Sequence, residues 1–223
     1  MFCTNCGKEI EPENSLCPLC GFDLTHIIAL LNEPDDDDYK DIEDEVRAPG
    51  EIAKRALSLA AVISCAYGDS RKDVIAWLKQ EDLWDTVSPA EKEFLQNKST
   101  REQDAKFTWR IEALVPLLWA INKIEAMPDL KSECDTGPLK KAVVWPPAST
   151  KEYIASAKIR AEDELSEEYE KVYQAHWKVR DARLNNKSVP KKFNPEVVYE
   201  RHYGFNWVIG YMGQDWDDIT TDT

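Results

Sequence analysis

The stretch FTWRIEALVPLLWAI, residues 107–121, decides the fold. Between Ile111 and Ile121 apolar residues occur on every side of a helical wheel, so a helix here must be surrounded by other elements. We expect this helix to run from about Thr100 to Ala126 and to form the centre of a domain. Glu112 lies inside the apolar stretch, and a buried carboxylate needs a partner from elsewhere in the chain.

Helix start signals recur on both sides of this stretch, whereas strand signals are scarce. Two of the signals are capping boxes, Ser88-Pro-Ala-Glu91 and Thr100-Arg-Glu-Gln103. We count about seven helices, which begin near Pro49, Asp69, Ser88, Thr100, Thr150, Asp163 and Asn194. Turn-rich joints at Pro128, Gly137-Pro138 and Pro146-Pro147 separate them. The prediction for residues 46–223 is an all-α globular domain, without a phosphate-binding loop or a nucleophile elbow.

The N-terminus contains one nine-residue unit twice, FCTNCGKEI at residues 2–10 and LCPLCGFDL at residues 16–24. Two residues between cysteines let both thiolates of a tight turn converge on one ion. Together the pairs predict a closed tetrahedral site for one structural Zn²⁺, with Cys3, Cys6, Cys17 and Cys20 as ligands. The predicted fold of residues 1–24 is a small zinc ribbon of knuckles and short β elements. Two disulfides and an iron–sulfur or redox site are the alternatives.

Residues 25–45 read as a short apolar segment followed by an acidic linker. Residues 33–45 hold nine acidic residues and one lysine, so they carry a net charge of −8 of the −14 of the whole chain. Mutual repulsion favours an extended tether, and the alternative is a lure for a basic partner. This charge argues against nucleic-acid binding by the ribbon and linker, and only weakly against it for the nearly neutral helical body. No targeting segment or membrane span is visible, which predicts a cytoplasmic protein.

Polar residues occupy positions where helical periodicity predicts the interior of the body. His176, Arg180 and Arg183 share the inward face of the helix that begins near Asp163. On the following helix Tyr199, His202 and Asn206 form a second stripe. With Glu112 they make a candidate polar cluster of Glu112, His176, Arg180, Arg183, His202 and Asn206.

Two interpretations of this cluster compete. In the first, Glu112 or Glu200 pairs with Arg180 or Arg183 in a closed structural network. In the second, the helices leave a cleft in which the arginines bind a small anion and a histidine acts as general acid or base. No catalytic residue is assigned, because the sequence offers no activated nucleophile.

Several segments resemble the bacterial domain-of-unknown-function family 4272, in order along nearly the whole body: residues 77–95, 107–121, 154–160, 176–184, 199–207 and 216–223. The resemblance implies a helical domain and supplies no activity, cofactor or catalytic residue. Residues 2–24 resemble the short zinc ribbons found at the start of many bacterial proteins.

These features predict a non-enzymatic binding or adaptor protein with a protein partner. An enzyme or small-anion sensor built on the polar cluster is one alternative. An immunity-like inhibitor of a basic protein is another. No function is assigned to the tail Trp216–Thr223.

Overall fold

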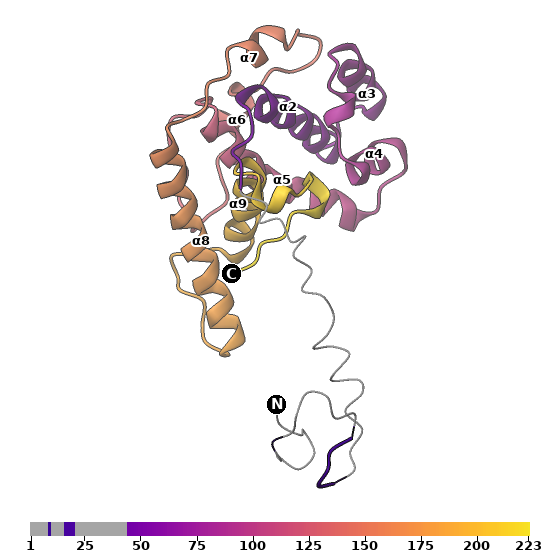
Figure 1. The fold of residues 1–223 in the computed structure, drawn as a ribbon. Coiled ribbons are helices and arrows are strands. Elements are labelled where there is room, and N and C mark those ends of the chain that lie inside the picture. Colours follow the sequence, from indigo (N-terminus) through magenta and orange to yellow (C-terminus); the bar gives the residue numbers. More distant parts are fainter. Residues whose placement is uncertain (1–8, 10–15, 21–43) are drawn as a thin grey trace. The chain divides into compact units, whose positions relative to one another are not determined.

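A computed structural model describes residues 9, 16–20 and 44–223; Cys3, Cys6 and most of the predicted linker lie outside them. The chain divides into two units, Met1–Ile42 and Glu43–Thr223, and each is described by itself. The described part of the second unit is helical (Figure 1), which confirms the mainly α fold class there. Its α-helices are α2 (Pro49–Ala66), α3 (Arg71–Gln80), α4 (Pro89–Gln96), α5 (Arg101–Ala120), α6 (Thr136–Lys141), α7 (Lys151–Ala155), α8 (Glu162–Leu184) and α9 (Pro195–Val208). Three 3-10 helices accompany them: η1 (Trp84–Thr86), η2 (Tyr211–Gly213) and η3 (Trp216–Asp218).

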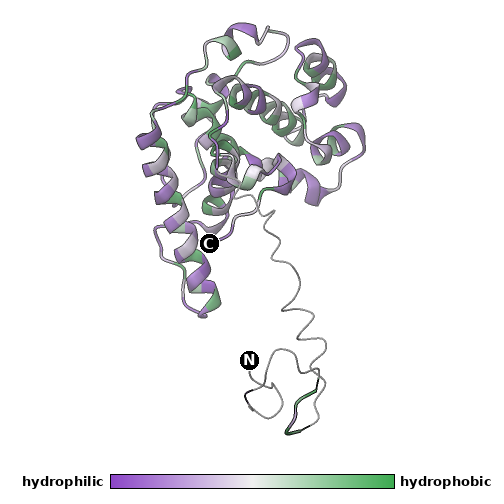
Figure 2. Cartoon of the chain, in the orientation of Figure 1, coloured by the Kyte–Doolittle hydropathy of each residue, from purple (hydrophilic) through white to green (hydrophobic). Residues whose placement is uncertain are grey.

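The helix α5 forms the centre of this unit, as the apolar stretch predicts. It makes its most extensive contacts with α9 and α2, and α8 packs against α9. Figure 2 shows hydrophobic residues along α2 and many hydrophilic ones along α8, which covers the core with only one face. Among the described helices, none has the length and hydropathy that crossing a membrane requires.

Both predicted capping boxes are present. At the start of α4, the Ser88 amide donates to Glu91 Oε2 at 2.9 Å, and the Glu91 amide donates to Ser88 Oγ at 3.3 Å. At the start of α5, Thr100 and Gln103 make the same reciprocal pair at 2.9 and 3.2 Å. These bonds satisfy amides that have no partner within the helix, so they fix where each helix begins.

The predicted end of the central helix is wrong by six residues, because α5 stops at Ala120 and not at Ala126. Asn122 has a φ of 58°, which turns the chain out of the helix. The Arg160 guanidinium binds carbonyls on both sides of this turn, with Nε donating to Trp119 O at 2.7 Å and Nη2 donating to Ile124 O at 3.0 Å. A long-range cap of this kind leaves no local signal in the sequence.

The Gly137-Pro138 joint is a second correction, since it lies inside the short helix α6. Asp135 caps this helix by accepting a hydrogen bond from the Gly137 amide at 2.9 Å. Proline is tolerated in a first helical turn, where amides lack partners in any case. The described body therefore has eight α-helices where the sequence suggested about seven.

Helices α5 and α9 approach each other closely at Gly204. A Cβ atom at this position would lie 2.6 Å from Pro116 Cγ and against the backbone carbonyl of Ala113. Only a residue without a side chain permits this distance between the two backbones. The close approach brings the polar side chains of α9 to the level of Glu112 on α5.

Candidate functional site

Two of the four predicted zinc ligands lie within the described residues. Cys17 is buried, and Cys20 ends a turn that includes Pro18 and Leu19. Glu9 and Leu16 are each in an isolated β-bridge, in the region where the sequence predicts short β elements. The turn between Cys17 and Cys20 fits a knuckle, and four thiolates are a donor set that suits zinc.

The buried carboxylate of Glu112 finds its partner in Arg201 of α9. Arg201 Nε and Nη2 donate to Glu112 Oε2 at 3.0 and 2.8 Å, and both side chains are 0% exposed. The other carboxylate oxygen, Oε1, accepts the Cys134 amide at 2.7 Å. Arg201 Nη1 donates to the carbonyls of Pro128 and Asp129 at 2.5 and 2.7 Å. The pair thus joins α5, α9 and the connection before α6, with its hydrogen bonds satisfied.

The sequence predicted that Glu112 or Glu200 pairs with Arg180 or Arg183, and this prediction is wrong for both glutamates. Glu200 pairs instead with Arg110 of α5, whose Nη1 lies 2.9 Å from Glu200 Oε2. Burial raises the pKa of Glu200, and Arg110 opposes this rise. Arg183 is exposed on α8 and forms a surface pair with Glu196 at 3.4 Å. The prediction that Arg183 faces the interior is therefore wrong: it lies in the last turn of α8, which ends at Leu184, and its long side chain reaches water.

His176 of α8 and His202 of α9 meet in the core, with their Nδ1 atoms 2.8 Å apart. One ring must donate its N–H and the other must accept it, so neither ring needs a positive charge. Burial lowers the pKa of His176 to about 4, and Arg180 adds to this effect. Burial and the neighbouring His176 lower the pKa of His202 to about 3. Both shifts favour the neutral form of the two rings, which suits a hydrogen bond between them.

Asn206 holds the C-terminal tail, whose role the sequence did not indicate. Its Nδ2 donates to Thr220 O at 2.7 Å. Trp216 is buried against the aromatic rings of Tyr203 and Trp207, and the Tyr203 hydroxyl donates to its carbonyl. Arg180 reaches the same tail, with Nη1 3.5 Å from Thr221 O. The tail thus forms part of the domain.

Part of the polar cluster still borders an open space. His176 and Arg183 line a cavity of about 250 Å³ together with Lys106, Tyr199 and Glu200. Tyr199 is 41% exposed at its edge. Glu112, His202 and Asn206 are absent from this lining and have no exposed surface. The structure therefore separates the predicted cluster into a closed core and a shallow surface site.

Sequence reasoning missed the arginines that complete the core. Arg201 is 0% exposed and Arg110 is buried, yet both lie beside residues that the periodicity had already placed inside. The available signal was the run Glu200-Arg201-His202, three consecutive polar residues in a largely apolar helix. Because consecutive positions of a helix point in different directions, such a run must face more than one neighbour.

Comparison with protein families agrees with this architecture. The family described as a domain of unknown function (DUF4272) matches residues 38–219, and the zinc-ribbon domain matches residues 2–24. Neither the curated proteins nor the solved structures contain a match. Since the first match covers most of the chain, this protein belongs to the DUF4272 family and carries a zinc-ribbon segment before its helical body.

Proposed function

We propose that the protein is a non-enzymatic binding or adaptor protein, in which a zinc ribbon precedes a helical recognition domain. The ribbon holds one structural Zn²⁺ through Cys3, Cys6, Cys17 and Cys20. Four thiolates complete a tetrahedral shell and leave no position for a substrate or a reactive water. A segment of about 24 residues buries too little apolar surface to fold alone, so the metal supplies most of its folding free energy.

One observation carries the non-enzymatic part of the proposal: the ion pair of Glu112 and Arg201 has no exposed surface. The pair uses both oxygens of the carboxylate and all three nitrogens of the guanidinium within the protein. A catalytic carboxylate has to reach a substrate directly or through one water molecule. Glu112 therefore supports helix packing, and the histidine pair beside it stays neutral.

The partner that we propose is another protein. The acidic segment at residues 33–45 would speed association with a basic partner through long-range attraction. In the inhibitor version of this proposal, replacing Asp35–Asp38 by serine slows association at low salt and has little effect at high salt. An unchanged association rate at low salt rules that version out.

The experiment is affinity capture with three forms of the full-length chain: wild type, Cys17→Ser/Cys20→Ser, and Cys65→Ser/Cys134→Ser. The last is the matched control, because it removes two cysteines outside the ribbon motif. We expect wild type and control to retain a partner at a defined stoichiometry, and the ribbon variant to lose it. Absence of any stoichiometric partner from the zinc-loaded wild type contradicts the adaptor role.

A small-anion sensor is the second candidate, because Lys106, His176 and Arg183 line one cavity. Phosphate titration followed by the ring resonances of His176 tests it. Saturable shifts that disappear in Lys106→Gln support the sensor. Unchanged resonances at millimolar phosphate exclude it.

A further inference from the structure

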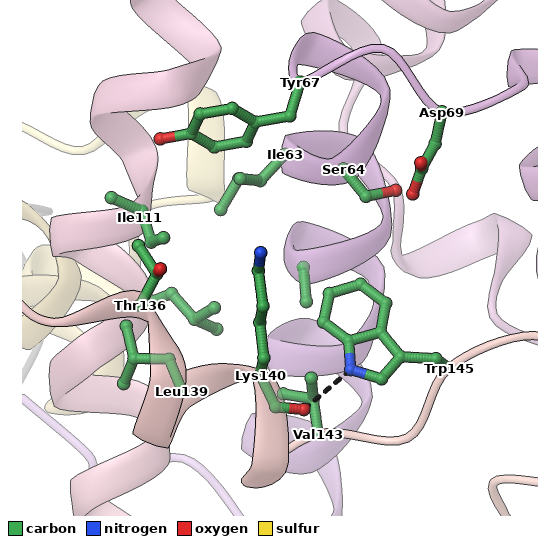
Figure 3. Close-up of a pocket in the computed structure, with 12 residues that line it drawn as sticks. Ile63, Ser64, Tyr67, Asp69, Ile111, Thr136, Leu139, Lys140, Val143 and Trp145 are labelled. Atoms are coloured by element: carbon green, nitrogen blue, oxygen red, sulfur yellow. Dashed lines mark hydrogen bonds between the residues drawn. The ribbon is translucent and has the colours of Figure 1, made fainter.

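A larger cavity, of about 450 Å³, lies between α2, α5 and α6 on another part of the body (Figure 3). Its volume falls within the range of about 300–1,000 Å³ that small-molecule sites occupy. The walls are mainly apolar, and the side chains that form them include Ile63, Ile111, Leu114, Leu139, Val143 and Trp145. A ligand with an apolar body can therefore lose its hydration shell in this cavity.

One cation projects into this space. Figure 3 shows the Lys140 amine between Ile63 and Trp145, and no described carboxylate lies within ion-pair distance of it. The base of this lysine is held in place, because Trp145 Nε1 donates to the Lys140 carbonyl at 2.7 Å. Lys140 is itself exposed, so water partly screens its charge, and the apolar walls beside it limit this screening on one side only.

The other polar groups of the cavity are mostly donors. Tyr67, Ser64 and Thr136 line it, and each carries a hydroxyl that can donate a hydrogen bond at neutral pH. Asp69 is the one acidic side chain in the lining. In Figure 3 it lies next to Ser64, on the side away from the Lys140 amine.

We propose that this cavity binds a small amphipathic carboxylate. The apolar body of this ligand lies between α2, α5 and α6. The ligand carboxylate accepts hydrogen bonds from the Lys140 ammonium and from a neighbouring hydroxyl. A charge-assisted hydrogen bond of this type gives the orientation, and burial of the apolar body gives most of the affinity. The proposal depends neither on the zinc ribbon nor on the adaptor role.

The test uses the full-length chain and three probes with the same chain length: octanoate, octanamide and octylammonium. The Trp145 indole N–H resonance, assigned with Trp145→Phe, reports binding because this residue lines the cavity. We expect octanoate to bind saturably and to bind more tightly than octanamide. Lys140→Gln should weaken octanoate binding about fivefold, which corresponds to about 1 kcal/mol, and should leave octanamide binding unchanged.

Two variants serve as controls. Lys141→Gln changes the next residue, an exposed lysine outside the cavity lining, and should shift octanoate affinity less than about twofold. Lys140→Arg keeps the charge and should retain most of the binding. Asp69→Asn removes the repulsive charge and should tighten octanoate.

Three results overturn the proposal. The first is that none of the probes saturates. The second is that Lys140→Gln and Lys141→Gln affect octanoate equally. The third is that octylammonium binds best and is weakened by Asp69→Asn, which would make the ligand a cation.

Discussion

Arg201 donates two hydrogen bonds to one carboxylate oxygen of Glu112, from Nε at 3.0 Å and from Nη2 at 2.8 Å, where neither side chain reaches water. The two residues are 89 positions apart in the chain. Their pairing fixes the register of α9 on α5, because a shift by one residue would leave two charges buried without partners.

Removing one member of this pair should destabilise the fold strongly. We expect Arg201→Met to lower the free energy of unfolding by about 3–5 kcal/mol, because Glu112 stays buried without its counter-charge. Replacing both, in Glu112→Leu/Arg201→Met, should recover a large part of this loss. Urea denaturation gives the free energy of unfolding of the wild type, of Arg201→Met and of the double variant.

The exposed pair of Arg183 and Glu196 supplies the control. Its side chains are 60% and 55% exposed, so Arg183→Met should change the free energy of unfolding by less than about 1 kcal/mol. Equal effects of Arg201→Met and Arg183→Met would mean that the buried pair does not hold α9 in place.

Gly204 should tolerate no side chain. A Cβ here meets Pro116 Cγ at 2.6 Å and the backbone of Ala113, so Gly204→Ala must push α9 away from α5. We expect a loss of about 1–3 kcal/mol or more in the free energy of unfolding. In the control Gly50→Ala, the nearest atom to the new Cβ is Ile154 Cγ2 at 3.9 Å, and the change should be neutral or stabilising. A neutral Gly204→Ala would contradict the close helix contact.

Acid should destabilise the body through the histidine pair. The pKa values of His176 and His202 are about 4 and about 3, below the ordinary value of 6.5. The unfolded chain therefore takes up protons first as the pH falls below 6.5, and stability is lost from pH 6.5 down to about 4 for His176 and about 3 for His202. We expect a loss of about 1–2 kcal/mol per histidine by pH 5.

The variant His176→Gln/His202→Gln isolates this effect. Glu200, with its raised pKa, contributes with the opposite sign and is present in both proteins. The difference in the pH dependence of unfolding between wild type and variant thus reports the histidines. Parallel pH profiles would show that the pair is not held neutral by the fold.

Asp217, which belongs to the C-terminal tail, should stabilise the start of α4. Its Oδ1 accepts the Ser88 hydroxyl at 2.7 Å, and its Oδ2 accepts the Ala90 amide at 2.9 Å. We expect Asp217→Ala to cost about 1 kcal/mol in thermal or urea unfolding, as the loss of a helix cap does. Asp218→Ala alters the next aspartate, which makes no such bond, and should have little effect. If Asp217→Ala and Asp218→Ala change the free energy of unfolding equally, the tail does not stabilise α4.

Local patterns predicted much of this fold. The capping residues Ser88 and Thr100, and the starts at Pro49 and Pro195, depend on contacts within a few residues, so the sequence reveals them directly. The apolar stretch around Leu117 likewise identifies the central helix. The end of α5 depends on Arg160, about 40 residues away, and no local pattern encodes such a contact.

The candidate site was predicted only in part for the same reason. Periodicity correctly placed Glu112, His176, His202 and Asn206 in the interior. It could not select the partner of Glu112, because the choice among Arg180, Arg183 and Arg201 depends on the crossing of α8 and α9 over α5. Helical period fixes the direction of a side chain and leaves its neighbour undetermined.

Native mass spectrometry of the full-length chain tests the proposed structural zinc site. We predict one bound Zn²⁺, which is lost in Cys17→Ser/Cys20→Ser and retained in Cys65→Ser/Cys134→Ser. A metal-free mass lower by the four hydrogens of two disulfides, or the mass of an iron–sulfur cluster, would contradict the claim.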